Sequence, residues 1–324
     1  MTDAPRVLVT GATGFVGQAL LDALGRSGTP VTAAVRREVP LPTGVRVCRV
    51  GALGPATDWG DALAGCDGVV HLAGRVHVMK EDSAAPLAEY RRVNVAGTLT
   101  LAKQAAAAGV KRFLFVSSIK VNGESTPPGA AFTEDARPAP LDPYGISKAE
   151  AEAGLMALGA RTGMDVVVIR PPLVYGPGVR GNFRSLVRWL TRGIPLPLGS
   201  IRENRRTLVG LDNLVDFMMI CLRHPAAANQ IFLAGDGEDL STTDLLRRMA
   251  AALGVRARLV PIPVSLLVAG ATLLGRGDDI RRLCGNLQAD IAKARRILGW
   301  TPPFSVDAGL RRAAHPPPTQ EIGR

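Results

Sequence analysis

Two residues in the stretch LDPYGISKAEAE are of types that could move a proton together. Tyr144 and Lys148 lie four positions apart, directly after Pro143, where a helix is expected to begin. Residues four apart share one face of a helix, so the phenol and the ammonium should point the same way. A nearby cation favours the phenolate form of tyrosine, whose pKa is otherwise near ~10. The pair therefore predicts a site that exchanges a proton with a hydroxyl or a ketone.

A glycine-rich stretch follows the first expected strand. The sequence RVLVTGATGFVGQAL places Gly11, Gly14 and Gly17 between an apolar strand and a helix. Glycines at such a junction permit a tight turn, let backbone amides approach a pyrophosphate and allow the helix to pack on the strand. We therefore expect a bound dinucleotide, contacted by the loop and the first helical turn: Gly11, Thr13, Gly14, Phe15, Val16 and Gly17.

The residues after the second expected strand bear on which dinucleotide binds. Arg36 and Arg37 stand where an acidic side chain would accept a hydrogen bond from the adenosine ribose. Arginines suit a 2′-phosphate instead, because the phosphate needs positive partners. The pattern favours NADP(H), with NAD(H) as the alternative.

Apolar strands and helices alternate in the first half of the chain and must position these groups. Segments such as RVLVT, VTAAVR, GVVHLAG and KRFLFVSS are apolar throughout, as in a parallel sheet buried on both faces. We predict an α/β fold with a Rossmann-type doubly wound parallel sheet over residues 1–172. Residues 173–324 should form a smaller C-terminal substrate-binding region, with about 207–236 packing back on the sheet. Periodicity further predicts one helix over 90–110 and one strand over 164–176.

Composition narrows the class of ligand. The chain has 324 residues and a formal net charge of +11, but only 4% of its residues are aromatic. This is too few for a base-stacking surface, so an anionic metabolite is favoured over nucleic acid. The four cysteines and four histidines show no metal-ligand spacing, so no metal site is expected and His71 should be a packed residue.

No membrane-spanning segment is expected. The N-terminus runs straight into a strand, and the longest apolar run, PIPVSLLVAGATLLG, is shorter than the ~20 residues that a span requires. We expect a cytoplasmic protein without an integral membrane segment. Arginines near this run leave contact with a membrane surface open as an alternative.

The motifs together resemble the short-chain dehydrogenase/reductase superfamily: a glycine loop, VSS at a strand end and YxxxK at a helix start. HLAG, RVNVAGT, RPPLVYGPG and RRTLVGLDNLVD make the chain similar to the extended branch, the NAD-dependent epimerase/dehydratase family. The resemblance implies catalysis by Ser118, Tyr144 and Lys148, with Ser118 bonded to the substrate oxygen. It also implies cofactor contacts by Tyr144 and Lys148 and by Leu72, Ala73, Gly74, Asn94, Ser117 and Pro171, with Asn94 mainly a structural support.

The loop after Ser118 bears on the type of reaction. Family dehydratases carry an acidic pair where this chain has Ile119 and Lys120, so water elimination is excluded. SSIKVNGE looks closest to a bacterial polysaccharide subgroup that reduces UDP-4-keto-6-deoxy-N-acetylglucosamine to UDP-N-acetylquinovosamine. With Arg36 and Arg37, this predicts an NAD(P)H-dependent reductase acting at C4 of a nucleotide sugar. The alternatives are a UDP-glucose or UDP-N-acetylglucosamine 4-epimerase with tightly bound NAD, and a non-catalytic dinucleotide-sensing regulator.

The resemblance also indicates how a UDP-sugar would be held. It implies that Asn182 and Arg206 contact the diphosphate, with Arg282 as a weaker candidate, and that Ser118 and Lys120 lie beside the substrate. A guanidinium group suits phosphate oxygens because its donors form a fork. Family members often dimerise through the helix that carries YxxxK, so the resemblance allows a homodimer.

Overall fold

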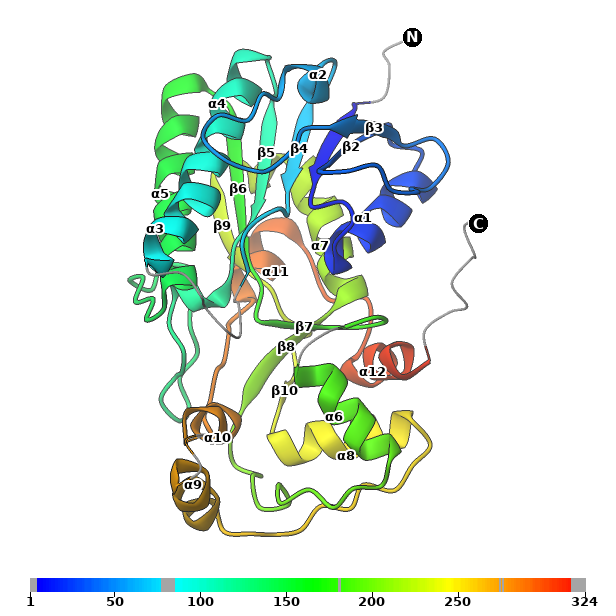
Figure 1. Ribbon diagram of the computed structural model, residues 1–324, viewed down its shortest axis with the longest axis vertical. Coiled ribbons are helices and arrows are strands. Elements are labelled where there is room, and N and C mark those ends of the chain that lie inside the picture. Colours follow the sequence, from blue (N-terminus) through cyan, green and yellow to red (C-terminus); the bar gives the residue numbers. More distant parts are fainter. Residues whose placement is uncertain (1–4, 77–84, 180–181, 274, 276, 316–324) are drawn as a thin grey trace.

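The computed structural model describes residues 5–76, 85–179, 182–273, 275 and 277–315, without the side chains of residues 182, 278 and 279. Seven parallel strands form the large sheet in the upper half of Figure 1, in the order β3-β2-β1-β4-β5-β6-β9. Their bounds are β1 (Val7–Thr10), β2 (Val31–Val35), β3 (Arg46–Arg49), β4 (Gly68–His71), β5 (Arg112–Val116), β6 (Asp165–Arg170) and β9 (Gln230–Leu233). The strand order reverses direction between β1 and β4, and ligands of such sheets bind at the carboxyl ends of the strands beside this point.

Helices cover both faces of the large sheet. One face packs against α1 (Phe15–Arg26), α7 (Leu211–Arg223) and α11 (Ala292–Leu298), and the other against α2 (Gly60–Leu63), α4 (Thr98–Ala107) and α5 (Pro143–Thr162). Neighbouring residues of one strand enter different cores, as Val7 and Leu8 do. This explains the continuous apolar runs, and the predicted doubly wound α/β fold is confirmed.

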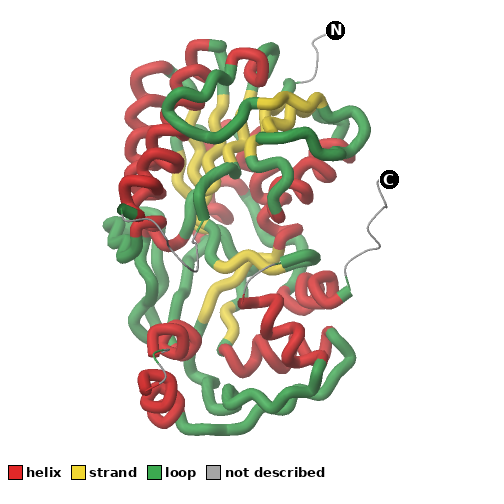
Figure 2. The backbone as a smooth tube through the Cα atoms, viewed as in Figure 1, coloured by secondary structure: helices red, strands yellow, loops and turns green. Residues whose placement is uncertain are grey.

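A second, three-stranded sheet lies below the first, in the order β10-β8-β7 (Figures 1 and 2). It consists of β7 (Leu173–Tyr175), β8 (Arg206–Gly210) and β10 (Asp239–Leu240). The helices α6 (Asn182–Thr191), α8 (Thr242–Ala252) and α12 (Val306–Ala314) share a separate apolar core with this sheet. Two further helices, α9 (Val264–Leu273) and α10 (Gly277–Cys284), pack on each other at the lower end of the molecule.

Two local predictions need correction, and one strand was not predicted. The helix expected over 90–110 is α3 (Pro86–Tyr90), a π-helical stretch Arg91–Gly97 and then α4. The strand expected over 164–176 is split into β6 and β7, which lie in different sheets, because the two intervening prolines cannot donate to a ladder. The edge strand β3 was missed, since three of its four side chains are exposed and it has no apolar run.

The later part of the chain returns to the large sheet. β9 pairs with β6, and α7 packs on α1, while Arg206–Gly210 forms a strand of the small sheet. The division of the chain into a cofactor-binding part, residues 1–172, and a substrate-binding part stays a prediction. Within the described ranges, every helix is too short or too polar to cross a bilayer.

His71 at the end of β4 is a packed residue, as predicted. Its two ring nitrogens lie 2.6 Å from the Thr10 hydroxyl and 2.9 Å from the Thr98 hydroxyl. Complete burial lowers the pKa of His71 to about 3, with a smaller contribution from the charge of Lys148. The imidazole is therefore neutral at physiological pH and supports the strand end.

Candidate active site

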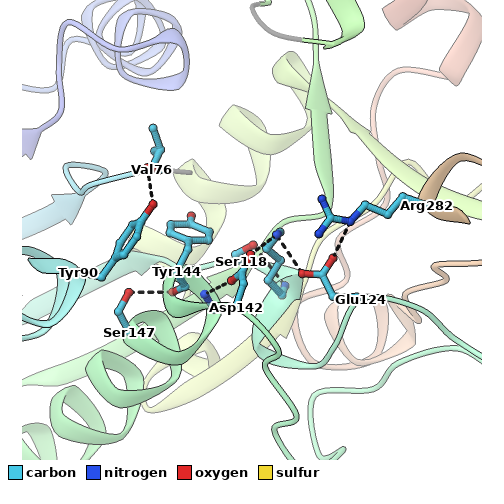
Figure 3. A network of polar contacts seen from close by, with 10 residues as sticks. Val76, Tyr90, Ser118, Glu124, Asp142, Tyr144, Ser147 and Arg282 are labelled. Carbon is cyan, nitrogen blue, oxygen red and sulfur yellow. Dashed lines mark hydrogen bonds and ion pairs between the residues drawn. The ribbon is translucent and has the colours of Figure 1, made fainter. Parts of the chain in front are cut away.

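Ser118 and Tyr144 come together in a cavity of 2340 Å³ between the two sheets. Ser118 lies two residues after the end of β5, and Tyr144 is the second residue of α5 (Figure 3). The helix begins here because Pro143 fits the first turn and the Asp142 carboxylate accepts a hydrogen bond from the Gly145 amide at 2.7 Å. Figure 3 shows Tyr144 on the same side of this helix start as Ser118. The three predicted catalytic residues thus come from the loop after β5 and from α5, the helix that covers this part of the large sheet.

Lys148 lies one turn further along α5 and is buried. Its ammonium donates a hydrogen bond to the Val116 carbonyl at 2.8 Å and lies 4.2 Å from the centre of the Phe115 ring. Burial lowers the pKa of Lys148 to about 8, while the Glu152 carboxylate opposes that shift. A cation held in this way is fixed beneath the tyrosine end of the helix and loses its charge more readily than an exposed lysine.

Tyr144 is a weak acid in this environment. Burial raises the pKa of Tyr144 to about 12, the Asp142 carboxylate adds to the increase, and a hydrogen bond with Ser118 opposes it. The ring of Tyr90 packs edge-on at 6.2 Å between centroids, and its hydroxyl donates to the Val76 carbonyl at 3.1 Å. Tyr144 therefore requires additional positive charge nearby before it can act as a base.

The loop after β1 forms a cradle that only glycine permits. Gly11 has a φ of +68°, and a Cβ there would lie 2.8 Å from the Ala73 nitrogen. A Cβ on Gly17 would lie 2.2 Å from the Gly11 carbonyl oxygen, which explains the close packing of α1. Gly14 caps α1 without a side-chain hydrogen bond, and the first turn has no acidic residue. Thr13, Gly14 and Phe15 line the cavity at this helix start, where backbone amides are free of an intrahelical partner, so the site fits a pyrophosphate.

The loop after β4 forms the opposite edge of the cradle. The Leu72 amide donates to the Thr10 carbonyl at 3.3 Å, and the Ala73 amide donates to the Thr10 hydroxyl at 3.2 Å. A Cβ on Gly74 would lie 3.0 Å from the Asn94 side-chain oxygen, so close approach again needs glycine.

Asn94 ties this loop to the catalytic helix from its place in the π-helical stretch. It accepts a hydrogen bond from the Arg75 amide at 2.7 Å and donates to the Ser147 hydroxyl at 3.0 Å. Its side chain also donates to the Arg75 carbonyl at 3.0 Å. Because these bonds go to protein groups, Asn94 fits a supporting role rather than direct contact with a ligand.

The remaining predicted cofactor residues differ in exposure. The Pro171 carbonyl accepts from the Ile119 amide at 3.0 Å and so fixes the serine loop. Ser117 is buried, and its hydroxyl has no hydrogen-bond partner among the described residues. Val16 is half-buried against the core, whereas Arg36 and Arg37 are exposed just beyond β2. Both arginine side chains are therefore in contact with solvent at the end of β2.

Basic residues line the cavity on the side of the small sheet. Arg206, at the start of β8, donates to the carbonyls of Arg282 at 2.7 Å and Gly285 at 3.1 Å. Burial lowers the pKa of Arg206, while the Glu124 carboxylate opposes that shift. Arg206 and Arg282 thus both line the cavity, and their contact with a diphosphate stays a prediction. Asn182 begins α6, but its side chain lies outside the described part of the structure.

Lys120 is held by two carboxylates. Its ammonium lies 2.5 Å from the Asp142 oxygen and 2.9 Å from a Glu124 oxygen. The other Glu124 oxygen lies 3.8 Å from the Arg282 guanidinium (Figure 3). A line of alternating charges therefore runs from the start of α5 to α10 along the cavity.

A comparison with protein families shows which family the chain belongs to. Residues 7–235 match the model of the NAD dependent epimerase/dehydratase family. The chain belongs to this family.

Individual members of the epimerase/dehydratase family narrow the comparison. The chain is 47% identical to a UDP-glucose 4-epimerase of Vibrio cholerae over 309 residues, which is 95% of this chain and 94% of that protein. The structure of MoeE5 in complex with UDP-glucose and NAD has a TM-score of 0.76 at 30% identity, covering 95% of this chain and 97% of that one. The structure of RMD from Pseudomonas aeruginosa complexed with NADPH has a TM-score of 0.72 at 25% identity, and the match covers 95% of this chain and 98% of that one.

These comparisons correct one prediction within the family and leave a second without support. The predicted 4-keto-sugar reductase is wrong, because the 47% identical relative is an epimerase. Proton transfer at a sugar hydroxyl is part of both reactions, so Ser118, Tyr144 and Lys148 could not separate an epimerase from a reductase. NAD(H) is supported, whereas the predicted preference for NADP(H) has no support from these comparisons.

Sequence reasoning missed Glu124, Asp142 and Tyr90. Asp142 could have been found, because an Asp followed by Pro at a helix start is a capping signal. Glu124 has no such signal, since its partners lie far away in the sequence. It is a carboxylate in the cavity where none was expected, but it is paired with Lys120.

Proposed function

We propose that the chain is a 4-epimerase of a UDP-sugar that works with tightly bound NAD. The observation that carries the proposal is 47% identity along nearly the whole length of a Vibrio cholerae UDP-glucose 4-epimerase. The meeting of Ser118 and Tyr144 in one cavity with the glycine cradle supports the same chemistry.

The reaction inverts one carbon and needs a proton carrier. The Tyr144 phenolate would take the proton of the 4-hydroxyl as the sugar becomes a 4-ketone, and return it afterwards. Ser118 would donate a hydrogen bond to the same oxygen. When bound, the nicotinamide supplies the acceptor and the donor of the hydride. The positive charges of Lys148 and of an oxidised nicotinamide lower a tyrosine pKa, which offsets the burial of the phenol.

The sugar must present both faces of the ketone within one turnover. A cavity of 2340 Å³ leaves room for a hexose to turn while the diphosphate stays bound. Arg206 and Arg282 would hold that diphosphate on the side of the small sheet. Glucose and N-acetylglucosamine both remain in the proposed substrate class.

The experiment is an epimerisation assay without added cofactor. Purified protein incubated with UDP-glucose, and separately with UDP-N-acetylglucosamine, should form the 4-epimer of at least one, and denaturation should release NAD. Nucleotide sugars are separated by ion-exchange chromatography. Consumption of NADPH in step with product, or no epimer from either sugar, would exclude the proposal.

The identity of the dinucleotide is tested at Arg36. Arg36→Ala should leave the amount of co-purified NAD unchanged, because the side chain is exposed beyond β2. Enzymatic determination of NAD and NADP in the released material is the measurement. Bound NADP that is lost on this substitution would restore the preference for NADP(H).

A further inference from the structure

The helix α9 exposes an apolar face at the lower end of the molecule. None of its ten residues is fully buried, and its sequence VSLLVAGATL has no charged residue. Leu266 is 63% exposed and Leu273 is 88% exposed. Together with Ala269 and Gly270 they occupy positions three, four and seven apart, which lie on one face of a helix. An uncharged, outward-facing surface of this kind marks an interaction site.

The inner side of α9 already has its partners. Leu267 packs against the apolar core of the small sheet, and Val268 and Ala271 are half-buried. α9 also packs on α10. The exposed leucines are therefore not needed to hold the helix in place.

The segment that leads into α9 adds apolar side chains to this end. Leu196 pairs with Leu259, so the loop after α6 runs beside the segment between α8 and α9 along the lower edge of Figure 1. Ile194 and Val260 are 40% and 43% exposed there. We call Ile194, Val260, Val264, Leu266 and Leu273 the apolar end.

Exposed arginines adjoin the apolar end. Arg256 and Arg258 are exposed and alternate with the half-buried Val255 and Ala257, so both point outward from the segment before α9. Neither forms an ion pair with any residue that the structure describes. Unpaired guanidinium groups beside an apolar helix suit a surface that is negatively charged at its boundary and apolar beneath.

We propose that the apolar end docks the protein on the surface of an anionic lipid bilayer, with α9 lying in the interface. Ten helical residues extend only ~15 Å, half the thickness of a hydrocarbon core, so α9 can lie in a membrane surface but not cross it. A second copy of the chain is a poorer occupant, because α9 has no carboxylate that could pair with the arginines of another copy. Ala271 also lines the cavity, so docking would hold the cavity mouth near the bilayer.

The test is co-sedimentation of the full chain with vesicles. Wild-type protein should bind vesicles of phosphatidylcholine mixed with phosphatidylglycerol, and bind less to phosphatidylcholine alone. Leu266→Asp with Leu273→Asp should lower the bound fraction at least about tenfold, since two charges would enter the apolar layer. Arg256→Gln and Arg258→Gln should each lower the partition coefficient about fivefold, an effect that added salt removes.

The matched control is Val47→Asp on the edge strand β3. Val47 is 44% exposed and lies on the large sheet, away from α9, so this change should leave vesicle binding unaltered. Thermal unfolding and epimerase activity of the Leu266→Asp, Leu273→Asp variant should match wild type, which separates docking from folding and catalysis. Absence of vesicle binding, binding that survives the two leucine substitutions, or a dimer that those substitutions dissociate would each overturn the proposal.

Discussion

The two sides of the cavity are built in different ways. Ser118 lies just after β5, and Tyr144 and Lys148 lie in α5, which shares an apolar core with that strand; Lys148 is buried. Arg206 and Arg282 come from β8 and α10, and Arg206 is held by backbone carbonyls of a distant part of the chain. Under the proposed function, the first side would fix a proton carrier, whereas the second would offer charge to a mobile anion. Changes on the first side should therefore affect turnover, and changes on the second should affect affinity.

The sharpest test of the first side is Tyr144→Phe. Loss of the proton route should lower kcat by about a hundredfold to ten-thousandfold, with co-purified NAD unchanged. Tyr90→Phe is the matched control, because it removes only the hydroxyl that donates to the Val76 carbonyl. Steady-state epimerisation of UDP-sugar measures both. A tenfold loss or less in Tyr144→Phe would remove the tyrosine from the proposed role.

The rigidity of the first side depends on a buried ion pair between Glu152 of α5 and Arg170 of β6. Their closest atoms are 2.6 Å apart, and both side chains are less than 5% exposed. Glu152→Gln should lower the free energy of unfolding by about 3–5 kcal/mol, because it leaves Arg170 buried without its counter-charge. Urea denaturation is the measurement. The control is Glu150→Gln, also on α5, which breaks an exposed ion pair with Arg91 and should change the free energy of unfolding little. Equal losses of stability in the two variants would contradict this account.

On the second side, Arg206→Ala should raise KM more than it lowers kcat. Loss of charged hydrogen bonds to a diphosphate corresponds to about tenfold to a hundredfold in KM. Arg205→Ala is the control, since Arg205 is exposed and its guanidinium donates to the nearby backbone carbonyls of Arg202 and Asn204. A fall in kcat with an unchanged KM would place Arg206 with the proton-transfer residues instead.

The smallest effect concerns the cost of burying Lys148. Burial lowers its pKa from 10.5 to about 8, so below pH 8 the folded protein carries a charge that the unfolded chain holds more easily. Lys148→Met should raise the free energy of unfolding at pH 7 by about 1–2 kcal/mol, less than the ~3 kcal/mol of the shift, because the bond to Val116 is lost. Activity should fall in the same variant.

The sign of the pH dependence follows from proton binding. Between about pH 8 and 10.5 the unfolded chain binds more protons at this lysine than the folded protein does, so wild type gains stability relative to Lys148→Met as the pH rises. Urea denaturation at pH 7 and near pH 10 is the check. A stability difference that is the same at both values would show that Lys148 is not buried as a cation.

The sequence predicted those features that arise from short stretches. The parallel sheet could be predicted because strands buried on both faces read as apolar runs, whereas β3 could not because its side chains are mostly exposed. Helical spacing placed Tyr144 and Lys148 one turn apart on α5, whereas the contacts of Lys148 with the Val116 carbonyl and the Phe115 ring could not be predicted from that spacing. The link from Asp142 through Lys120 and Glu124 to Arg282 joins three separate segments, so no local pattern announces it.

The type of reaction could not be predicted from the site residues. Reduction and epimerisation place the same hydroxyl, phenol and ammonium around one carbon. They differ in how firmly the dinucleotide is retained and how freely the sugar turns, and neither property belongs to a motif. The preference for NADP(H) drawn from Arg36 and Arg37 has no support from the comparisons, and exposed arginines at a strand end are common without a phosphate partner.

The π-helical stretch Arg91–Gly97 changes the rotation of α3 about the helix axis relative to α4. An α-helix advances ~100° per residue, so removing one residue from this stretch would turn everything before it by about that angle while α4 stayed in place. Tyr90 would then swing off the ring of Tyr144, and Asn94 would lose its register with Ser147. The wider helical turn thus sets how Tyr90 and Asn94 align with α5. This alignment should tolerate side-chain substitutions in Arg91–Gly97 better than an insertion or a deletion.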